Sequence, residues 1–77
     1  MKSLEEFVQL FAEQFDDTDS EMITAETRYH DLDEWSSLVV LSLIAVVDEE
    51  FEVALTGDDI QQAVTVKDLY DKIVSSL

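Results

Sequence analysis

Apolar residues recur at helical spacing in the first part of the chain. Positions three or four apart hold Leu4, Phe7, Val8, Phe11 and Phe15, which is the spacing of one helix face. Ser3 and Glu6, three residues apart, form a capping-box pattern just before this run. The pattern predicts an amphipathic helix over residues 4–15 with an aromatic face in the core.

A second helix is predicted over residues 37–50. Its core stripe would consist of Val40, Leu43, Ile44, Val47 and Phe51, which follow one another at steps of three and four. The opposite face would carry Ser37, Leu38, Leu41, Ser42, Ala45, Asp48 and Glu49. Scattered exposed leucines are normal, but three apolar residues on one outward face indicate a docking surface.

Two further helical segments follow. Thr56 is a predicted cap for a short helical turn, with Ile60 and Ala63 inward. Thr65 and Asp68 resemble a second capping box. They precede a last helix that would end near Ser76, with an apolar face of Val66, Leu69, Tyr70, Ile73 and Val74.

The stretch from Asp16 to Trp35 shows no sustained periodicity. Loops of this length are uncommon in compact domains and are often functional. We expect Ile23, Tyr29 and Leu32 to attach it to the core. The chain is thus predicted to be all-α: a small four-helix bundle with three longer helices, one short one and a long loop between the first and second.

Composition supports this prediction and narrows the function. The 77 residues include no proline and one glycine, which favours helices over a turn-rich β fold. The capped first helix directly after Met1 and the lack of a linker lead us to expect one free-standing domain, residues 1–77. The chain contains no signal-like segment and no apolar run of about 20 residues. We therefore expect a cytoplasmic monomer that does not insert into membranes.

The net charge of −15 comes from 19 acidic and four basic residues. It argues against nucleic-acid partners, which need a basic face, and against anionic lipid. It favours partners with basic surfaces, although the charge could also serve solubility alone.

Other candidate chemistry is weak. Counted from Asp17, the acidic cluster after the first helix has Met22 where a calcium loop needs glycine and Arg28 where it needs glutamate. No nucleophile is evidently positioned beside His30, so we interpret it as a solvated loop residue. There is no cysteine and no recognisable catalytic triad or glycine-rich phosphate loop. We do not expect an enzyme.

Two serines stand where the acidic loop gives way to the second helix. Ser36 is a good N-cap, because its hydroxyl can accept a bond from a first-turn amide. Ser37 is then the first helical residue and faces outward. A helix N-terminus accommodates a phosphate well, so the Ser37 hydroxyl is a sensible attachment point for a phosphate ester. From these residues alone, capping is the simpler explanation of the pair.

The Trp-Ser-Ser-Leu segment at residues 35–38, with the apolar run to Phe51, resembles the acyl carrier protein family around its Asp-Ser-Leu motif. Residues 23–32 resemble the loop of that family, and residues 64–69 the start of its last helix. In that family the serine before the leucine carries 4′-phosphopantetheine. The resemblance implies that Ser37 is the carrier serine. Ser36 departs from the pattern, which usually has Asp.

The resemblance implies a covalent 4′-phosphopantetheine arm, transferred from coenzyme A by a phosphopantetheinyl transferase, whose thiol holds an acyl or aminoacyl group as a thioester. Acyl-loading and acyl-transferring enzymes would be the other partners, as in fatty acid biosynthesis and lipid metabolism. The cargo would be sheltered where the stripe of Val40, Leu43, Ile44 and Val47 meets the last helix. Alternatives are an aminoacyl, D-alanyl or peptidyl carrier, and an unmodified acidic helical interaction module.

The expected partner face has an unusual charge pattern. Fatty-acid carriers of that family usually present acids at the positions of Ser36, Val39, Ser42, Asp48 and Glu49, and this chain has acids only at the last two. Leu38, Val39 and Leu41 would instead offer an apolar surface, with Ala45 beyond it. This indicates a specialised carrier for lipid, polyketide or related biosynthesis, unless Asp33 and Glu34 supply the missing charge at the transferase.

Overall fold

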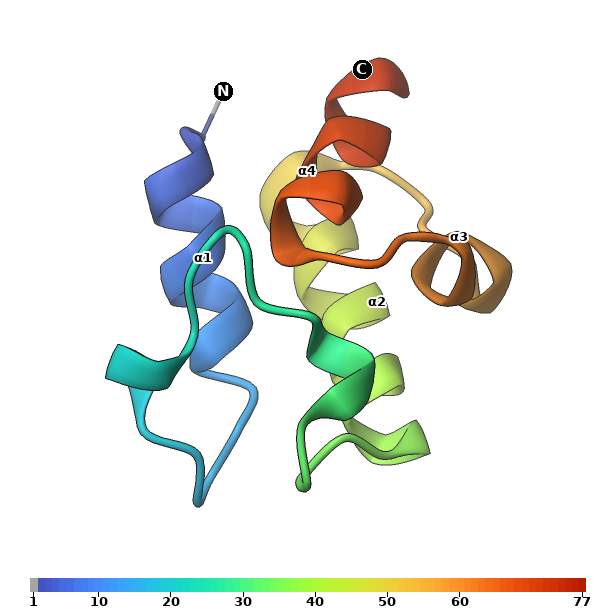
Figure 1. Cartoon of the computed structure of the whole chain (residues 1–77). Coiled ribbons are helices and arrows are strands. Elements are labelled where there is room, and N and C mark those ends of the chain that lie inside the picture. Colours follow the sequence, from blue (N-terminus) through green and yellow to red (C-terminus); the bar gives the residue numbers. More distant parts are fainter. Residues whose placement is uncertain (1) are drawn as a thin grey trace.

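The computed structural model describes residues 2–77, which form four α-helices and two short 3₁₀ turns (Figure 1). The elements in order are α1 (Leu4–Ala12), η1 (Ser20–Met22), η2 (Tyr29–Asp31), α2 (Ser37–Phe51), α3 (Gly57–Gln62) and α4 (Val66–Ser75). The only β pairing within residues 2–77 is an isolated bridge between Arg28 and Thr65. The prediction of an all-α fold, with one short helix and a long first loop, is confirmed.

Capping boxes start three of these helices. In α1, the Ser3 hydroxyl accepts from the Glu6 amide at 3.2 Å, and the Glu6 carboxylate accepts from the Ser3 amide at 3.3 Å. Thr56 with Asp59 caps α3 in the same way, and Thr65 with Asp68 caps α4. The amide bonds from each threonine hold the pKa of its aspartate below the usual range.

Two helix ends differ from the prediction. Helix α1 ends at Ala12, three residues early, and the Phe15 amide instead bonds to the Ala12 carbonyl at 3.1 Å in a tighter turn that still buries the Phe15 ring. Helix α2 runs one residue further than expected, to Phe51. It stops at Glu52, which adopts the left-handed conformation with φ 58°.

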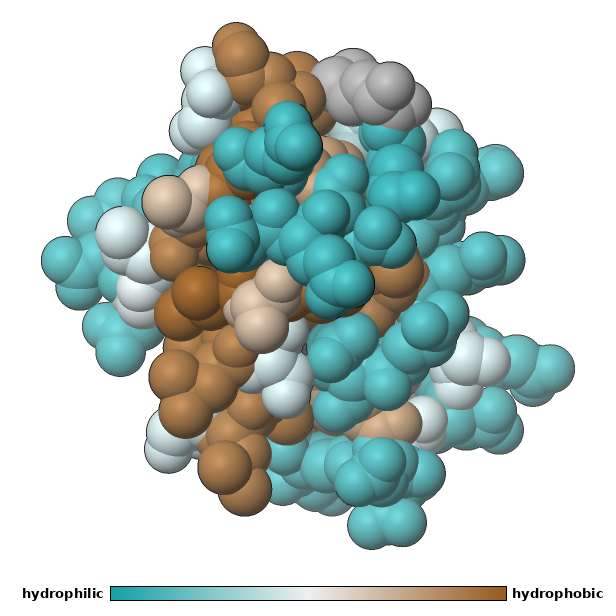
Figure 2. Space-filling view, turned by 180° about the vertical axis from the view of Figure 1, so that it is seen from behind, coloured by the Kyte–Doolittle hydropathy of each residue, from teal (hydrophilic) through white to brown (hydrophobic). Residues whose placement is uncertain are grey.

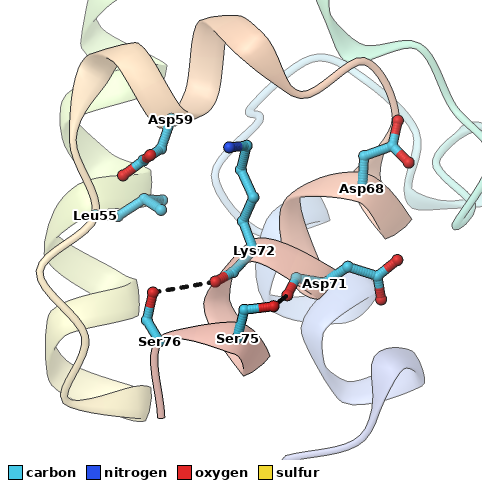
Figure 3. A pocket seen from close by; sticks show the side chains of 7 residues that line it. All are labelled: Leu55, Asp59, Asp68, Asp71, Lys72, Ser75 and Ser76. Carbon is cyan, nitrogen blue, oxygen red and sulfur yellow. Dashed lines mark hydrogen bonds between the residues drawn. The ribbon is translucent and has the colours of Figure 1, made fainter.

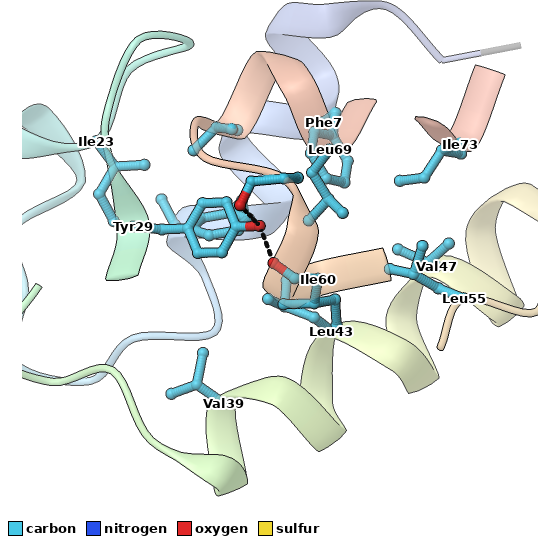
Figure 4. Packing of buried hydrophobic residues seen from close by; sticks show 14 of the residues in the cluster. Phe7, Ile23, Tyr29, Val39, Leu43, Val47, Leu55, Ile60, Leu69 and Ile73 are labelled. Carbon is cyan, nitrogen blue, oxygen red and sulfur yellow. Dashed lines mark hydrogen bonds between the residues drawn. The ribbon is translucent and has the colours of Figure 1, made fainter. Parts of the chain in front are cut away.

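The core draws on all four α-helices and on the long loop (Figure 4). Its fully buried side chains include Phe7, Phe11, Tyr29, Leu43, Val47, Ile60, Leu69 and Ile73. The buried row of α2 is Val39, Leu43, Val47 and Phe51, whereas Val40 and Ile44 are only half-buried. Val40 and Ile44 still pack against the margin of the core. The predicted stripe was therefore incomplete, since it missed the buried Val39: α2 is apolar on nearly every side, and packing chooses the face.

The loop before α2 fixes the end of α3. The buried Tyr29 hydroxyl donates to the carbonyls of Ile60 and Ala63 (Figure 4), and Nε2 of His30 lies 3.0 Å from the same Ala63 carbonyl. The last carbonyls of a helix lack intrahelical partners, so these bonds hold α3 against η2. Burial raises the pKa of Tyr29, and the nearby Asp68 charge adds to this. His30 is exposed but is more than the solvated residue we expected.

Glu34 ties the two ends of the long loop together. Its carboxylate accepts the backbone amides of Asp16, Asp17 and Thr18 at 2.7, 3.0 and 2.9 Å, together with the Thr18 hydroxyl at 2.8 Å. These bonds, the Thr18 hydroxyl first among them, lower the pKa of Glu34. The segment after α1 is thereby held beside the segment that leads into α2.

The middle of the loop is held separately. The Val66 amide donates to the Thr27 carbonyl at 3.2 Å, and the Lys67 amide donates to the Ala25 carbonyl at 2.8 Å. Ile23 and Tyr29 are buried as predicted, and Leu32 is half-buried. The loop is therefore anchored along its length, and it delivers residues 35–37 to one place beside α3.

Candidate functional site

The N-terminus of α2 differs from the other three. Ser36 occupies the N-cap position with extended backbone, but its hydroxyl makes no capping bond, so the prediction of a side-chain cap was wrong. The first turn of α2 also contains no acidic residue, whereas the first turns of α1, α3 and α4 all do. Among the described helices, this is the one start that neither a side-chain oxygen nor a carboxylate occupies.

This arrangement suits a phosphate ester. The first amides of α2 have no intrahelical partner, and the positive end of the helix dipole lies there. Ser37 is the first helical residue and is exposed. The Glu34 carboxylate, three residues upstream, is bonded to the amides of residues 16–18. The helix start at Ser37 therefore fits the phosphate of a phosphopantetheine arm, and the Glu34 carboxylate is bonded within the fold.

The outer face of α2 is apolar near Ser37 and acidic further on. Figure 2 shows the side of the molecule on which α2 lies, where apolar side chains gather in a band. Leu38 is 76% exposed and Leu41 61%. Ser42, Ala45, Asp48 and Glu49 are also exposed. Val39 is only 6% exposed, so its predicted place in the partner surface was wrong: it lies in the core row of α2.

An open hollow of about 390 Å³ lies between the start of α2, η2 and α3, and it reaches Val40, about one helical turn beyond Ser37. It is lined by His30, Trp35, Val40, Gly57 and Gln61. We expected a shelter for cargo between the second and last helices. Leu43 and Val47 are fully buried without cargo, so this shelter stays a prediction. The open space next to Val40 faces α3. The lining also includes polar groups, which the apolar pattern of α2 did not indicate.

A second hollow of about 410 Å³ lies between α3 and α4 (Figure 3). Its lining consists of Leu55, Asp59, Asp68, Asp71, Lys72, Ser75 and Ser76. The hydroxyls of Ser75 and Ser76 donate to the carbonyls of Asp71 and Lys72 at 2.9 and 3.2 Å. These serines are therefore engaged with their own helix, and the hollow contains none of the residues predicted to form the site.

The acidic loop forms a third and wider hollow of about 740 Å³, with Asp17, Asp19, Asp31 and Asp33 in its lining. Within residues 2–77, no three His, Cys, Asp or Glu side chains are placed to hold a metal ion together. No described helix combines the length and the apolar character required to span a bilayer.

In a comparison with protein families, residues 5–73 match a model described as "Phosphopantetheine attachment site". The matched span begins in α1 and ends in α4, and it includes the whole of α2 with Ser37. Searches of curated proteins and of solved structures found no match.

Proposed function

The chain belongs to the phosphopantetheine attachment site family, which is defined by a covalently attached 4′-phosphopantetheine arm, and we propose that the arm is esterified to Ser37. The family match carries the proposal that this is a carrier protein. The exposed first-turn position of Ser37, on a helix start free of acids and of a side-chain cap, supports the choice of residue.

The attachment chemistry needs little from the chain itself. The Ser37 oxygen forms a bond to the phosphorus that carries the pantetheine in coenzyme A, and its proton passes to a base of the transferase. The P–O bond of the pyrophosphate link to that phosphorus breaks, and adenosine 3′,5′-bisphosphate leaves. A transferase with magnesium would supply the base and the charge neutralisation. Once in place, the arm supplies a thiol that holds an acyl group as a thioester. The protein then acts by presenting that group to other enzymes, and we propose no catalytic residue within it.

The test is loading in vitro. The protein is incubated with coenzyme A and a phosphopantetheinyl transferase of broad specificity, and its intact mass is measured. Wild type should gain one phosphopantetheine, Ser37→Ala should gain none, and Ser36→Ala should load. Ser42→Ala, which alters another exposed serine of α2, is the matched control. A gain that persists in Ser37→Ala would contradict the assignment. A wild type that never gains mass would leave the unmodified interaction module as the function.

We further propose that partners dock on the α2 face that carries Leu38 and Leu41, with Ala45, Ser36 and Ser42 around them. Acids lie only at its far end, at Asp48 and Glu49. This distribution favours a partner with an apolar contact next to the arm and basic groups further along α2. It supports a specialised carrier in lipid, polyketide or related biosynthesis, and we propose that this carrier works as a cytoplasmic monomer.

Two leucines of equal exposure provide the test of this face. Leu41 is 61% exposed and lies on α2, and Leu77 is 60% exposed and lies at the C-terminal end. Leu41→Ser should lower kcat/KM for the transferase and for an acyl-loading enzyme, whereas Leu77→Ser should not. Equal effects of the two changes would contradict the proposed face.

The nature of the cargo needs a separate measurement. The thioester formed in cell extract, identified by mass spectrometry, distinguishes acyl from aminoacyl or peptidyl cargo.

A further inference from the structure

We propose that the first half of the arm on Ser37, its pantoyl unit, docks in the hollow lined by His30, Trp35, Val40, Gly57 and Gln61. The pantoyl unit is the part next to the phosphate and carries two methyl groups, a hydroxyl and an amide. This inference rests on the proposed attachment to Ser37, and it replaces a freely moving arm with one that has a preferred resting place on the protein.

The position of the hollow selects this part of the arm. Val40 follows Ser37 by three residues, so the two are neighbours on the helix surface, about 4.5 Å apart along the helix axis at ~1.5 Å per residue. Trp35 precedes Ser37 by two residues. A group this close to the attachment point is reached by the beginning of the arm. The thioester end would have to double back to reach the hollow.

The side chains of the hollow suit the pantoyl unit chemically. The Ala63 carbonyl can only accept, so the Nε2 of His30 that lies 3.0 Å away must donate. In the neutral ring, Nδ1 then remains an acceptor, suited to the pantoyl hydroxyl. The Gln61 amide is exposed and can both donate and accept. Val40 and Trp35, both half-buried, provide apolar surface for the two methyl groups.

The walls of the hollow are already in place. The His30 ring packs edge-on against Trp35, with centroids 5.5 Å apart, and lies 4.4 Å from the Tyr29 ring. Tyr29 and His30 are in turn bonded to the end of α3, which carries Gln61. Because these groups are held before the arm arrives, docking does not have to order the walls.

Docking there is compatible with the proposed partner face. At 3.6 residues per turn, Val40 lies about 60° to one side of Ser37 around α2, and Leu41 lies about 40° to the other side. An arm that turns toward Val40 and α3 leaves Leu38 and Leu41 uncovered. The arm could then rest in the hollow while an enzyme engages the apolar face.

Nuclear magnetic resonance of the loaded protein tests this directly. The chain has one tryptophan and one histidine, so their ring signals are unambiguous. We expect through-space contacts between the two methyl groups of the arm and the protons of Trp35 and Val40, which the phosphate alone cannot produce. An added Cβ at Gly57 meets no atom within 4 Å, so Gly57→Leu can fill the hollow from α3 and should abolish these contacts. Gly57→Ala should keep them.

A second pair of variants covers the case in which Gly57→Leu fails to fold. Gln61→Ala removes a lining side chain and should weaken the contacts, whereas Gln62→Ala changes an exposed neighbour outside the hollow and should not. The mass of each sample establishes loading first. Full loading of Ser37 with no methyl contacts to Trp35 or Val40 would overturn the docking alone. Failure to load would overturn the attachment to Ser37 and the docking with it.

Discussion

The Tyr29 hydroxyl donates to two carbonyls at the end of α3, and Tyr29→Phe isolates the contribution of this hydroxyl. The substitution keeps the buried ring, which contacts the rings of Phe11 and Trp35, and removes one O–H group. The Ala63 carbonyl keeps its bond from His30. The Ile60 carbonyl loses the Tyr29 hydroxyl as a donor.

The expected loss of stability follows from that carbonyl. A buried polar group left without its partner costs about 1–3 kcal/mol. For a domain of this size, 1 kcal/mol lowers the melting temperature by about 4–8 °C. Tyr29→Phe should therefore lower it by roughly 5–20 °C, with a matching fall in the free energy of unfolding in urea. The backbone signal in circular dichroism before unfolding should remain that of a helical protein.

Tyr70→Phe is the matched control. The Tyr70 hydroxyl donates to the Lys2 carbonyl at 2.7 Å, but this residue is half-buried and the acceptor lies near the N-terminus. Water can replace that bond, so the loss should be below about 1 kcal/mol. Equal destabilisation by the two substitutions, or none by Tyr29→Phe, would refute the view that the Tyr29 hydroxyl fixes the end of α3.

Three further outcomes are expected. Glu34→Gln should destabilise the protein near neutral pH. The difference in melting temperature from wild type should shrink as the pH falls past the ordinary glutamate pKa of about 4.3 and through the lowered pKa of Glu34 in the folded state. Melting temperatures that stay equally far apart at acid pH contradict this. The chain has a net charge of −15, and its acids crowd at Asp16, Asp17 and Asp19 and at Asp48, Glu49 and Glu50. Salt or divalent cations screen the repulsion between these charges and should raise the melting temperature. A melting temperature that does not change from low to moderate salt counts against this repulsion. The double change Ser36→Asp and Ser42→Glu should raise the kcat/KM of a fatty-acid ketosynthase or malonyl transferase for the loaded protein by roughly two- to thirtyfold, since each added rim ion pair contributes ~0.2–1 kcal/mol. Val39 stays unchanged, because an acid there would be buried. A wild type that already equals the double variant refutes the specialised carrier.

The sequence predicted those parts of the fold that local patterns encode. The capping boxes at Ser3 and Thr65 lie where the serine or threonine and the acid three residues later placed them. The amphipathic faces of α1 and α4 were clear because polar residues mark their outer sides. In α2 polar residues are few. The sequence therefore did not show whether the row through Val39 or the row through Val40 faces the core, because that choice depends on packing against the neighbouring helices.

The contacts that organise the loop could not be predicted in this way. The Glu34 carboxylate reaches amides 16 to 18 residues away, and the Tyr29 hydroxyl reaches carbonyls more than 30 residues away. Neither contact leaves a periodic pattern in the sequence, because both groups lie on irregular backbone, where the spacing of residues does not predict which groups meet. The same limit applies to the hollow next to Val40, which His30 and Gln61 enter from separate segments. The position of Ser37 at the start of α2 and the outward placement of Leu38 and Leu41 were evident from sequence.

The central claim is that Ser37 carries the arm, and the location of the modification within the loaded protein tests it most directly. After loading from coenzyme A, the peptide that contains residues 35–38 is isolated and fragmented in a mass spectrometer. Fragments that separate Ser36 from Ser37 should carry the added phosphopantetheine on Ser37 and leave Ser36 unmodified. Phosphopantetheine found on Ser36, on another serine, or on no residue of a protein exposed to an active transferase would contradict the account.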